Sequence, residues 1–402
     1  MKDLSGNGMA ATYQWSFHAV QPLAGYRQLG SAANETSGGV AIDSNRNIVV
    51  TGATFGALDG ATSAGQDDAI LVKHDAAGNR LWTRQFGDAA ADNDGGVGVA
   101  TDAASGAVYV TGYWGHYSSF RRNGFLAKYD GAGSQLWWKD YSRTELRPAV
   151  DPAGSIYAAG YRTWGWVPGS SCGHTAWGGP AYPEITALAV NSSGAVLAGK
   201  SRFAVGATSS GPPEVFVLKC DAGGNYVWSS QSGMGAATAV ALDATGNIFV
   251  AGTTSGALDG TSAGESDLFL RRYDPAGNVV WTRQLESSLS DLASAVAVGA
   301  QGGVFVTGST MGDLDGHAST GDQDVFLVKY DGAGNKLWSR QFGTPATDRG
   351  TGLAVDPLGG VVIAGTTSSA LGGAHLGGSD VFLLRFSADG GMQQRSVGGR
   401  DG

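Results

Sequence analysis

The stretch from Ser294 to Gly343 reads SAVAVGAQGGVFVTGSTMGDLDGHASTGDQDVFLVKYDGAGNKLWSRQFG. It contains four short runs rich in β-branched and aromatic residues, and each run is bounded by Gly, Asn or Asp. Such runs are typical of β-strands joined by turns. No part of the stretch keeps the apolar spacing of a helix over several turns. The stretch therefore predicts four consecutive strands, which we number first to fourth.

The chain repeats this unit about seven times, at intervals of about 40 to 60 residues. In each copy the second strand ends in a glycine, and the first strand has an alanine two residues before its turn. The glycines are Gly52, Gly112, Gly160, Gly199, Gly252, Gly308 and Gly365, and the alanines are Ala41, Ala100, Ala149, Ala189, Ala241, Ala297 and Ala354. A four-stranded repeat at this period predicts an all-β fold, a seven-bladed β-propeller of four-stranded antiparallel blades. Blade three departs most from the repeat, so we expect it to be degenerate.

The third and fourth strands carry the most specific pattern. Asp324 to Asp331, Gly334-Asn335 and Trp338 resemble the bacterial seven-bladed beta-propeller (SBBP) repeat. Similar strings occur at Asp267 to Trp281, at Asp68 to Trp82 and, more loosely, at Glu214 to Trp228. The resemblance covers residues 31–398 or so. It implies a propeller and an often extracytoplasmic bacterial protein, but no single activity and no catalytic residues.

A tryptophan recurs in the fourth strand and is predicted to pack between blades. The residues assigned to this position are Trp82, Trp138, Trp228, Trp281 and Trp338.

One ring accounts for nearly all of the 402 residues. We expect residues 31–402 to form a single propeller domain, and residues 1–30 to form a tail that ends in a ring-closing strand. The string Arg27-Gln28-Leu29-Gly30 matches the end of the fourth strand at 340–343, so it predicts an outer strand for the last blade. Residues 392–397 are the alternative for that strand.

The composition narrows the class of partner and the compartment. The net charge is −9 and no basic run is present, which argues against nucleic acid. No apolar run approaches the roughly 18–20 residues that span a membrane. Residues 1–10 lack the apolar core of a signal peptide. The chain is thus either cytosolic or begins after a removed signal; the resemblance favours the second and a secreted, periplasmic or cell-surface protein.

Two kinds of connection are expected to lie on opposite ends of the ring. The turns that join the first to the second and the third to the fourth strands are short Asx-type turns, and they define the turn face. The loops that join the second to the third strand and the fourth strand to the next blade are longer and vary more, and they define the loop face. Function is more often found on such loops.

The loops of blades two to four abandon the regular pattern and are rich in aromatic residues and arginine. Such side chains suit stacking on sugar rings and pairing with anionic groups. The alternative is that these aromatics refill the core of a degenerate blade. The candidate ligand-binding residues are Tyr113, Trp114, His116, Tyr117, Arg121, Arg147, Arg162, Trp164, Trp166, His174, Trp177 and Arg202.

Calcium binding and a disulfide are weaker hypotheses. Asp59, Asp259 and Asp315 in the Asp-Gly loops could supply oxygen ligands, but calcium needs six to eight, and turn chemistry explains the motif. No other metal or cofactor is expected. The only cysteines, Cys172 and Cys220, fall in adjacent blades and could form a disulfide in an exported protein.

The sequence contains no nucleophile elbow, phosphate loop or metal-spaced histidines, so catalytic residues are unknown and an enzyme is disfavoured. The first hypothesis is an exported bacterial binding propeller. Its small-molecule, glycan or protein ligand, such as a carbohydrate or an anionic group, would lie on the loop face of blades two to four. The alternatives are a polysaccharide-acting hydrolase or lyase that uses the same loops or the channel mouth, and a structural spacer of a surface protein.

Overall fold

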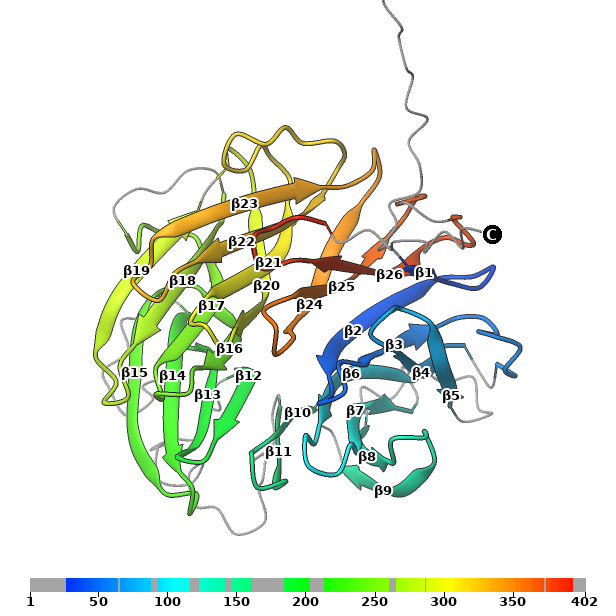
Figure 1. Ribbon diagram of the computed structural model, residues 1–402. Helices are drawn as coiled ribbons and strands as arrows, with labels where there is room; N and C mark the ends of the chain where they lie inside the picture. Colours follow the sequence, from blue (N-terminus) through cyan, green and yellow to red (C-terminus); the bar gives the residue numbers. More distant parts are fainter. Residues whose placement is uncertain are drawn as a thin grey trace, which may run out of the picture.

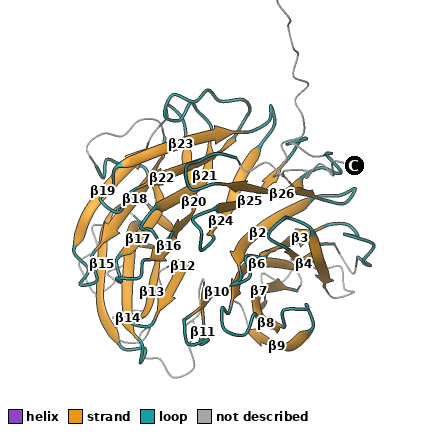
Figure 2. Ribbon diagram, viewed as in Figure 1, coloured by secondary structure: helices purple, strands orange, loops and turns teal. Residues whose placement is uncertain are grey.

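The computed structural model describes residues 27–63, 66–87, 93–115, 123–141, 146–160, 184–202, 213–259, 265–285, 287–371 and 374–392. These residues form separate small sheets placed around a ring (Figure 1). All of the regular structure in the described residues is β-strand, and none of it is helix (Figure 2). The all-β propeller expected from the repeat is therefore confirmed.

Six of the sheets are four-stranded and antiparallel; five have their strands in chain order from the axis outward, and in the sixth, β24-β25-β26-β1, the outer strand is the first of the chain. The first strands are β2 (Glu35–Ile42), β6 (Gly95–Thr101), β12 (Glu184–Asn191), β16 (Ala236–Leu242), β20 (Asp291–Val298) and β24 (Asp348–Val355). The second strands are β3 (Ile48–Thr54), β7 (Val108–Trp114), β13 (Gly194–Ser201), β17 (Ile248–Thr254), β21 (Val304–Thr310) and β25 (Val361–Thr367). The third strands are β4 (Asp68–His74), β8 (Asn123–Tyr129), β14 (Glu214–Asp221), β18 (Asp267–Tyr273), β22 (Asp324–Tyr330) and β26 (Asp380–Phe386). The fourth strands are β5 (Arg80–Phe86), β9 (Gln135–Tyr141), β15 (Tyr226–Met234), β19 (Val279–Leu285), β23 (Lys336–Phe342) and β1 (Arg27–Leu29).

The prediction of seven four-stranded blades is wrong for the part of the chain that is described, which contains six. Blade three contributes only a two-stranded sheet, β10 (Leu146–Val150) with β11 (Ile156–Gly160). In the sequence, residues 161–183, which lie outside the described residues, do not contain the SBBP-like string that marks the third and fourth strands elsewhere. The inner strand β10 still contacts β6 on one side and β12 on the other, and β24 contacts β2, so the ring of inner strands is closed.

The outer strand of blade seven comes from the N-terminal part of the chain. β1 pairs antiparallel with β26, with Gln28 opposite Phe382. This pairing agrees with the expectation that residues 27–29 supply the outer strand that closes the ring. Of the alternative segment, Met392 forms an isolated bridge to Phe386, and residues 393–397 lie outside the described residues. The first and last blades are thus joined by hydrogen bonds between segments at opposite ends of the sequence.

The core lies between neighbouring blades. The second and third strands are buried along almost their whole length, because the adjacent blades cover both faces. One apolar cluster, for example, joins Phe249 and Leu268 of blade five to Phe326 and Val328 of blade six. The recurring glycine allows the first and second strands to approach, since a Cβ on Gly308 would collide with the carbonyl of Leu292.

A shared carbonyl on the turn face holds blade one to blade two, blade four to blade five and blade five to blade six. Lys73 Nζ of β4 and Trp82 Nε1 of β5 both donate to Gly131 O in the third-to-fourth turn of blade two, at 3.3 and 3.1 Å. Arg272 and Trp281 share Gly332 O, and Lys219 and Trp228 share Pro275 O, in the same way. Of the two corresponding donors of blade six, Lys329 alone reaches the carbonyl of blade seven, because Trp338 Nε1 has no hydrogen-bond partner among the described residues. We call this set of contacts the latch.

The accepting turn is rigid and fits the tryptophan closely. Asp331 Oδ1 accepts from Asn335 N at 2.8 Å, and Asn335 Nδ2 donates back to Asp331 Oδ2 at 2.8 Å. Gly334, at φ +85°, lies against the indole of Trp281, and a Cβ on it would stand 2.8 Å from the ring. Arg283 stacks on the same indole and donates to Gly334 O at 2.7 Å. The turn thus needs glycine for its backbone and for the latch.

The register corrects one sequence assignment. Trp137, not Trp138, lies opposite Lys128, as Trp82 lies opposite Lys73. Trp138 points to the other face of the blade and stacks on Phe125 with ring centroids 4.3 Å apart. Two adjacent tryptophans made the position ambiguous in the sequence.

We expect Gly334→Ala to destabilise the protein more than Gly302→Ala. Gly302 has a similar φ of +78° in an equivalent turn, but nothing lies within 4 Å of its Cβ position. Gly302→Ala should cost about 1 kcal/mol through backbone strain alone. Gly334→Ala should cost about 1–3 kcal/mol more, because the indole must move. Urea unfolding of both variants measures the difference, and equal losses would contradict the latch.

Candidate functional site

Four of the predicted ligand-binding residues lie in the described part of the chain: Tyr113, Trp114, Arg147 and Arg202. The others lie outside the described residues, namely His116, Tyr117, Arg121, Arg162, Trp164, Trp166, His174 and Trp177. The four described residues belong to three consecutive positions around the ring, on β7, β10 and the end of β13.

Trp114 is the last residue of β7 and lies opposite Asn123. Its ring is half-buried against the apolar cluster that contains Phe125, and its indole nitrogen is buried without a hydrogen-bond partner among the described residues. Trp114 therefore contributes packing, and any contact with a ligand would use its remaining exposed part.

The second strands of blades two and four carry large polar side chains directly after the recurring glycine. Tyr113 and Lys200 occupy this position. The corresponding residues of the other four-stranded blades are small: Ala53, Thr253, Ser309 and Thr366. Lys200 Nζ forms an ion pair of 3.1 Å with Glu184 Oε2 of β12, and both side chains remain more than a third exposed. The pair was not predicted from the sequence, although Lys200 differs from the small residues that occupy the same position in the other blades.

Arg202 follows on the same edge and is exposed. Phe55 and Met311 occupy the equivalent position in blades one and six, where they are also exposed. The arc formed by Tyr113, Lys200 and Arg202 thus carries hydrogen-bonding and cationic groups where the regular blades carry apolar or small ones.

Arg147 places a charge on an inner strand. The equivalent residues of the other inner strands are Gly39, Gly98, Ala187, Ala239, Ala295 and Gly352. The Arg147 side chain is exposed, and its Nη1 lies 3.5 Å from Val97 O of β6. β10 pairs with β11 without the register shift found in the other inner strands, such as β2. A cationic side chain is therefore added near the axis beside blade two.

Buried carboxylates hold the loops of the loop face. Asp348, which opens β24, accepts from Thr344 N at 2.5 Å and so fixes the loop that leads into blade seven. Asp324, which opens β22, accepts from Thr320 N at 2.7 Å and from Gln341 Nε2 at 3.0 Å. Both aspartates are fully buried. Asp324 and Asp348 lie close to each other. Two further pairs of neighbouring carboxylates, Asp267 with Asp291 and Asp380 with Glu35, are also fully buried. The sequence did not reveal these pairs.

Burial raises the pKa of Asp348, and the nearby charge of Asp324 raises it further, against the hydrogen bonds from Thr367 and Thr344. A carboxyl group with a raised pKa in the folded state contributes stability below the ordinary value of 3.8, and the contribution is lost as the pH rises through the folded-state pKa. Ionisation of Asp348 therefore destabilises the folded protein through burial and the charge of Asp324, although the hydrogen bonds from Thr344 favour the carboxylate.

We expect Asp348→Asn to gain stability relative to the unchanged protein as the pH rises from about 4 to about 7, because Asn accepts the same backbone hydrogen bond and does not ionise. Asp331→Asn should show the opposite trend at lower pH, because hydrogen bonds from Asn335 lower the pKa of Asp331. This variant should lose stability relative to the unchanged protein as the pH rises toward 3.8, with little further change above it. Urea unfolding at several pH values checks both variants. Parallel pH profiles for Asp348→Asn and the unchanged protein would contradict this account.

The aspartates proposed as weak calcium candidates pair with protein groups. Asp59 contacts Arg80 and accepts from Thr83 Oγ1 at 2.5 Å, and Asp315 accepts from Lys336 and Ser339. Asp259 lies 3.7 Å from Arg283 Nη1. Asp59 and Asp315 both have φ +57°, which the Asp-Gly turn requires. No group of three or more His, Cys, Asp or Glu side chains suited to a metal ion occurs among the described residues.

We therefore expect a calcium chelator to leave the melting temperature unchanged. Bound calcium would stabilise the folded state, so its removal would lower the midpoint. Thermal unfolding with and without EGTA, each repeated after added calcium, measures the effect. A fall that calcium reverses would show that the Asp-Gly loops hold the ion.

Cys220, at the end of β14, is buried and disulfide-bonded. Its predicted partner, Cys172, lies outside the described residues. His74 takes the position of Tyr273 and Tyr330 and is equally buried; burial, with the charges of Arg80 and Arg27, lowers its pKa to about 4. His74 is thus a neutral packing residue, as its position in the repeat predicts.

These features define a β-propeller whose blades are held by repeated contacts and whose loop face is specialised over one arc. Residues 337–373 match the SBBP family, described as a beta-propeller repeat. The match runs from β23 through β24 and β25, so the chain carries the SBBP repeat that its third and fourth strands resemble. No helix in the described part of the chain is long and apolar enough to cross a membrane.

Similar proteins include regulatory protein FlaEY of Caulobacter vibrioides, 28% identical over 173 residues, which cover 38% of this chain and 18% of FlaEY. The chain thus matches less than a fifth of the length of this relative. Solved structures with a similar fold include the beta-propeller domain of the trilobed protease from Pyrococcus furiosus, with a TM-score of 0.46, 10% identity and coverage of 91% of this chain and 96% of that one. A PL25 ulvan lyase has a TM-score of 0.46 and 12% identity, and the alignment covers 92% of this chain and 98% of the lyase.

Proposed function

We propose that the chain is an exported bacterial binding propeller that holds an anionic carbohydrate, or a ligand of similar chemistry, on the loop face of blades two to four. The observation that carries the proposal is the substitution of Lys200, Arg202 and Arg147 into positions that hold small or apolar residues in the regular blades. The chain as a whole is acidic, with a net charge of −9, so cations gathered on one arc favour an anionic partner.

Aromatic residues add the second element of carbohydrate recognition. Tyr113 is half-buried at the same edge and can offer a ring face and a hydroxyl. The Lys200–Glu184 pair supplies donors and an acceptor within 3.1 Å of each other, which suits the paired hydroxyls of a sugar. The remaining aromatic candidates of this arc stay predictions.

We further propose that blade three completes a ring of seven blades. The support is the inner strand β10, which occupies its own place between β6 and β12. Export is proposed on two grounds: the SBBP resemblance, and the disulfide at Cys220, which persists in an oxidising compartment.

We expect a glycan array probed with the unchanged protein to select oligosaccharides that carry carboxylate or sulfate groups. Arg202→Ala should weaken binding to a selected ligand at least about tenfold, because a hydrogen bond to a charged group is lost. Met311→Ala is the matched control, since Met311 is the exposed equivalent of Arg202 on blade six, and it should bind normally.

Isothermal titration of both variants with the selected ligand decides the location of the site. Equal affinities for Arg202→Ala and Met311→Ala would place binding elsewhere. Turnover of the ligand during the titration would favour the enzyme alternative, and an array with no selected ligand would favour the spacer.

A further inference from the structure

Blade two carries a complete set of latch donors on the outer half of the turn face. Trp137 of β9 lies opposite Lys128 of β8, in the register that Trp338 and Lys329 have in blade six. Lys139 occupies the position of Arg340. We call Tyr109, Lys128, Trp137 and Lys139 the open latch.

The open latch has the same geometry as the latches that are engaged. Lys128 Nζ lies 5.1 Å from the centre of the Tyr109 ring, and Lys329 Nζ lies 5.1 Å from that of Phe305. Lys139 Nζ lies 5.6 Å from the centre of the Trp137 ring. The arginines of the engaged latches lie 5.4–5.5 Å from their tryptophans. Blade two thus holds its donors in the engaged arrangement.

The open latch lacks the acceptor that every engaged latch has. Lys329 Nζ donates to Ala388 O at 2.6 Å in the turn of blade seven, whereas no carbonyl among the described residues accepts from Lys128, Trp137 or Lys139. The reason is that blade three has no third-to-fourth turn among its described strands. Val150 and Ile156 of β10 and β11 pack in the same apolar cluster as Tyr109 and Trp137.

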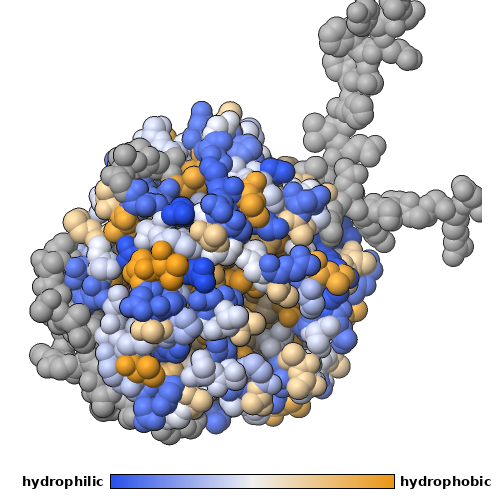
Figure 3. All heavy atoms as spheres, turned by 60° about the vertical axis from the view of Figure 1, so that its left-hand side comes forward, coloured by the Kyte–Doolittle hydropathy of each residue, from blue (hydrophilic) through white to orange (hydrophobic). Residues whose placement is uncertain are grey.

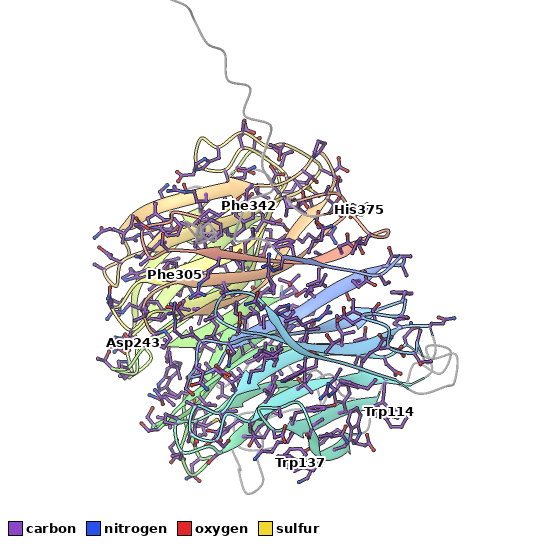
Figure 4. All side chains as sticks on the ribbon, turned by 45° about the vertical axis from the view of Figure 1, so that its right-hand side comes forward. Trp114, Trp137, Asp243, Phe305, Phe342 and His375 are labelled. Atoms are coloured by element: carbon purple, nitrogen blue, oxygen red, sulfur yellow. The ribbon has the colours of Figure 1, made fainter. Side chains whose placement is uncertain are left out.

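The open latch is also accessible and apart from the proposed ligand site. Trp137 is half-buried and Lys139 is exposed. Figure 4 shows Trp137 at the outer rim of the molecule, well away from Trp114 at the loop-face end of the same blade. On the face in Figure 3, hydrophobic residues form separate spots among hydrophilic ones, so surface hydrophobicity alone does not mark a docking site there.

We propose that the open latch binds a glycine-containing Asx turn of another polypeptide, of the kind that closes the third and fourth strands of an SBBP repeat. The engaged latches of this chain define the partner. A backbone carbonyl accepts from both the cation and the indole, as Gly131 O does from Lys73 and Trp82. A glycine lies flat on the indole, as Gly133 does on Trp82, where a Cβ would stand 2.8 Å from the ring.

The charge of the open latch agrees with this partner. It presents two ammonium groups, and the aspartate that begins the accepting turn adds a negative charge to the ligand. Among the groups nearby, Asp102 accepts a hydrogen bond from the Ser105 hydroxyl. That hydrogen bond, together with a smaller effect of the Lys128 charge, lowers the pKa of the Asp102 carboxyl. Asp140 accepts a hydrogen bond from Trp138 Nε1 at 2.6 Å. Its carboxylate therefore lies on the face of β9 opposite to Trp137.

The test is an NMR titration of the full chain with a cyclic peptide that contains Asp-Gly-Ala-Gly-Asn, the sequence of residues 331–335. We expect the indole N–H signal of Trp137, assigned through Trp137→Phe, to shift in a saturable way. The control peptide has alanine in place of the second glycine, and it should bind at least about tenfold more weakly because its Cβ meets the indole.

Two variants locate the contact. Lys128→Met should weaken binding about tenfold through the lost charged donor, whereas Leu136→Ala, a change at an adjacent residue that is 55% exposed, should leave it unchanged. Unfolding temperatures of all variants confirm that the fold is intact. The proposal fails if the Trp137 signal does not move, if the alanine peptide binds equally well, or if slow exchange of the Trp137 N–H in the free protein shows that this chain already covers it.

Discussion

The fold depends on one hydrogen-bonded contact, the turn carbonyl that accepts from a cation and an indole of the preceding blade. Lys73 and Trp82 reach Gly131 in this way, and Arg385 of the last blade reaches Ala76 O of the first at 2.6 Å. A cation of blades one, four, five and six thus reaches the turn of the next blade, and a cation of the last blade reaches the first. Among the described residues, blade three offers no such turn, and the donors of blade two have no carbonyl partner there.

The two faces of the ring are held by different chemistry. On the turn face, long cationic side chains and indoles cross from blade to blade. On the loop face, short buried carboxylates such as Asp324 and Asp348 hold loops within and between blades. A carboxylate that accepts backbone N–H groups fixes only the first residues of a loop, so the rest of the loop is free to change in sequence. The framework thus tolerates the divergence of blades two to four, where the candidate site lies.

Much of the fold could be predicted because each blade repeats its strands within one short stretch of sequence. The match of Arg27-Gln28-Leu29 to the fourth strand even predicted the ring-closing segment. Features that depend on register or on the neighbouring blade could not be predicted. Adjacent Trp137 and Trp138 differ only in which face they occupy, and the described residues of blade three form only its inner strands, β10 and β11. Of the site, the divergent arc was visible, whereas the Lys200–Glu184 pair meets only once β12 and β13 are aligned.

The open latch raises the question of why blade two keeps donors for which the described part of the chain supplies no acceptor. Retention has a small energetic cost, because Lys139 is exposed and its ammonium group stays hydrated. Within blade two, Tyr109 supports Lys128 and Trp137 supports Lys139, and Val150 and Ile156 of blade three pack in the same apolar cluster as Tyr109 and Trp137. A partner turn would therefore meet side chains already held in the bound arrangement, and little rotamer entropy would be lost on binding. Side chains that keep the bound arrangement favour binding. Side chains that had lost this role would form other contacts instead, as Trp138 does with Asp140.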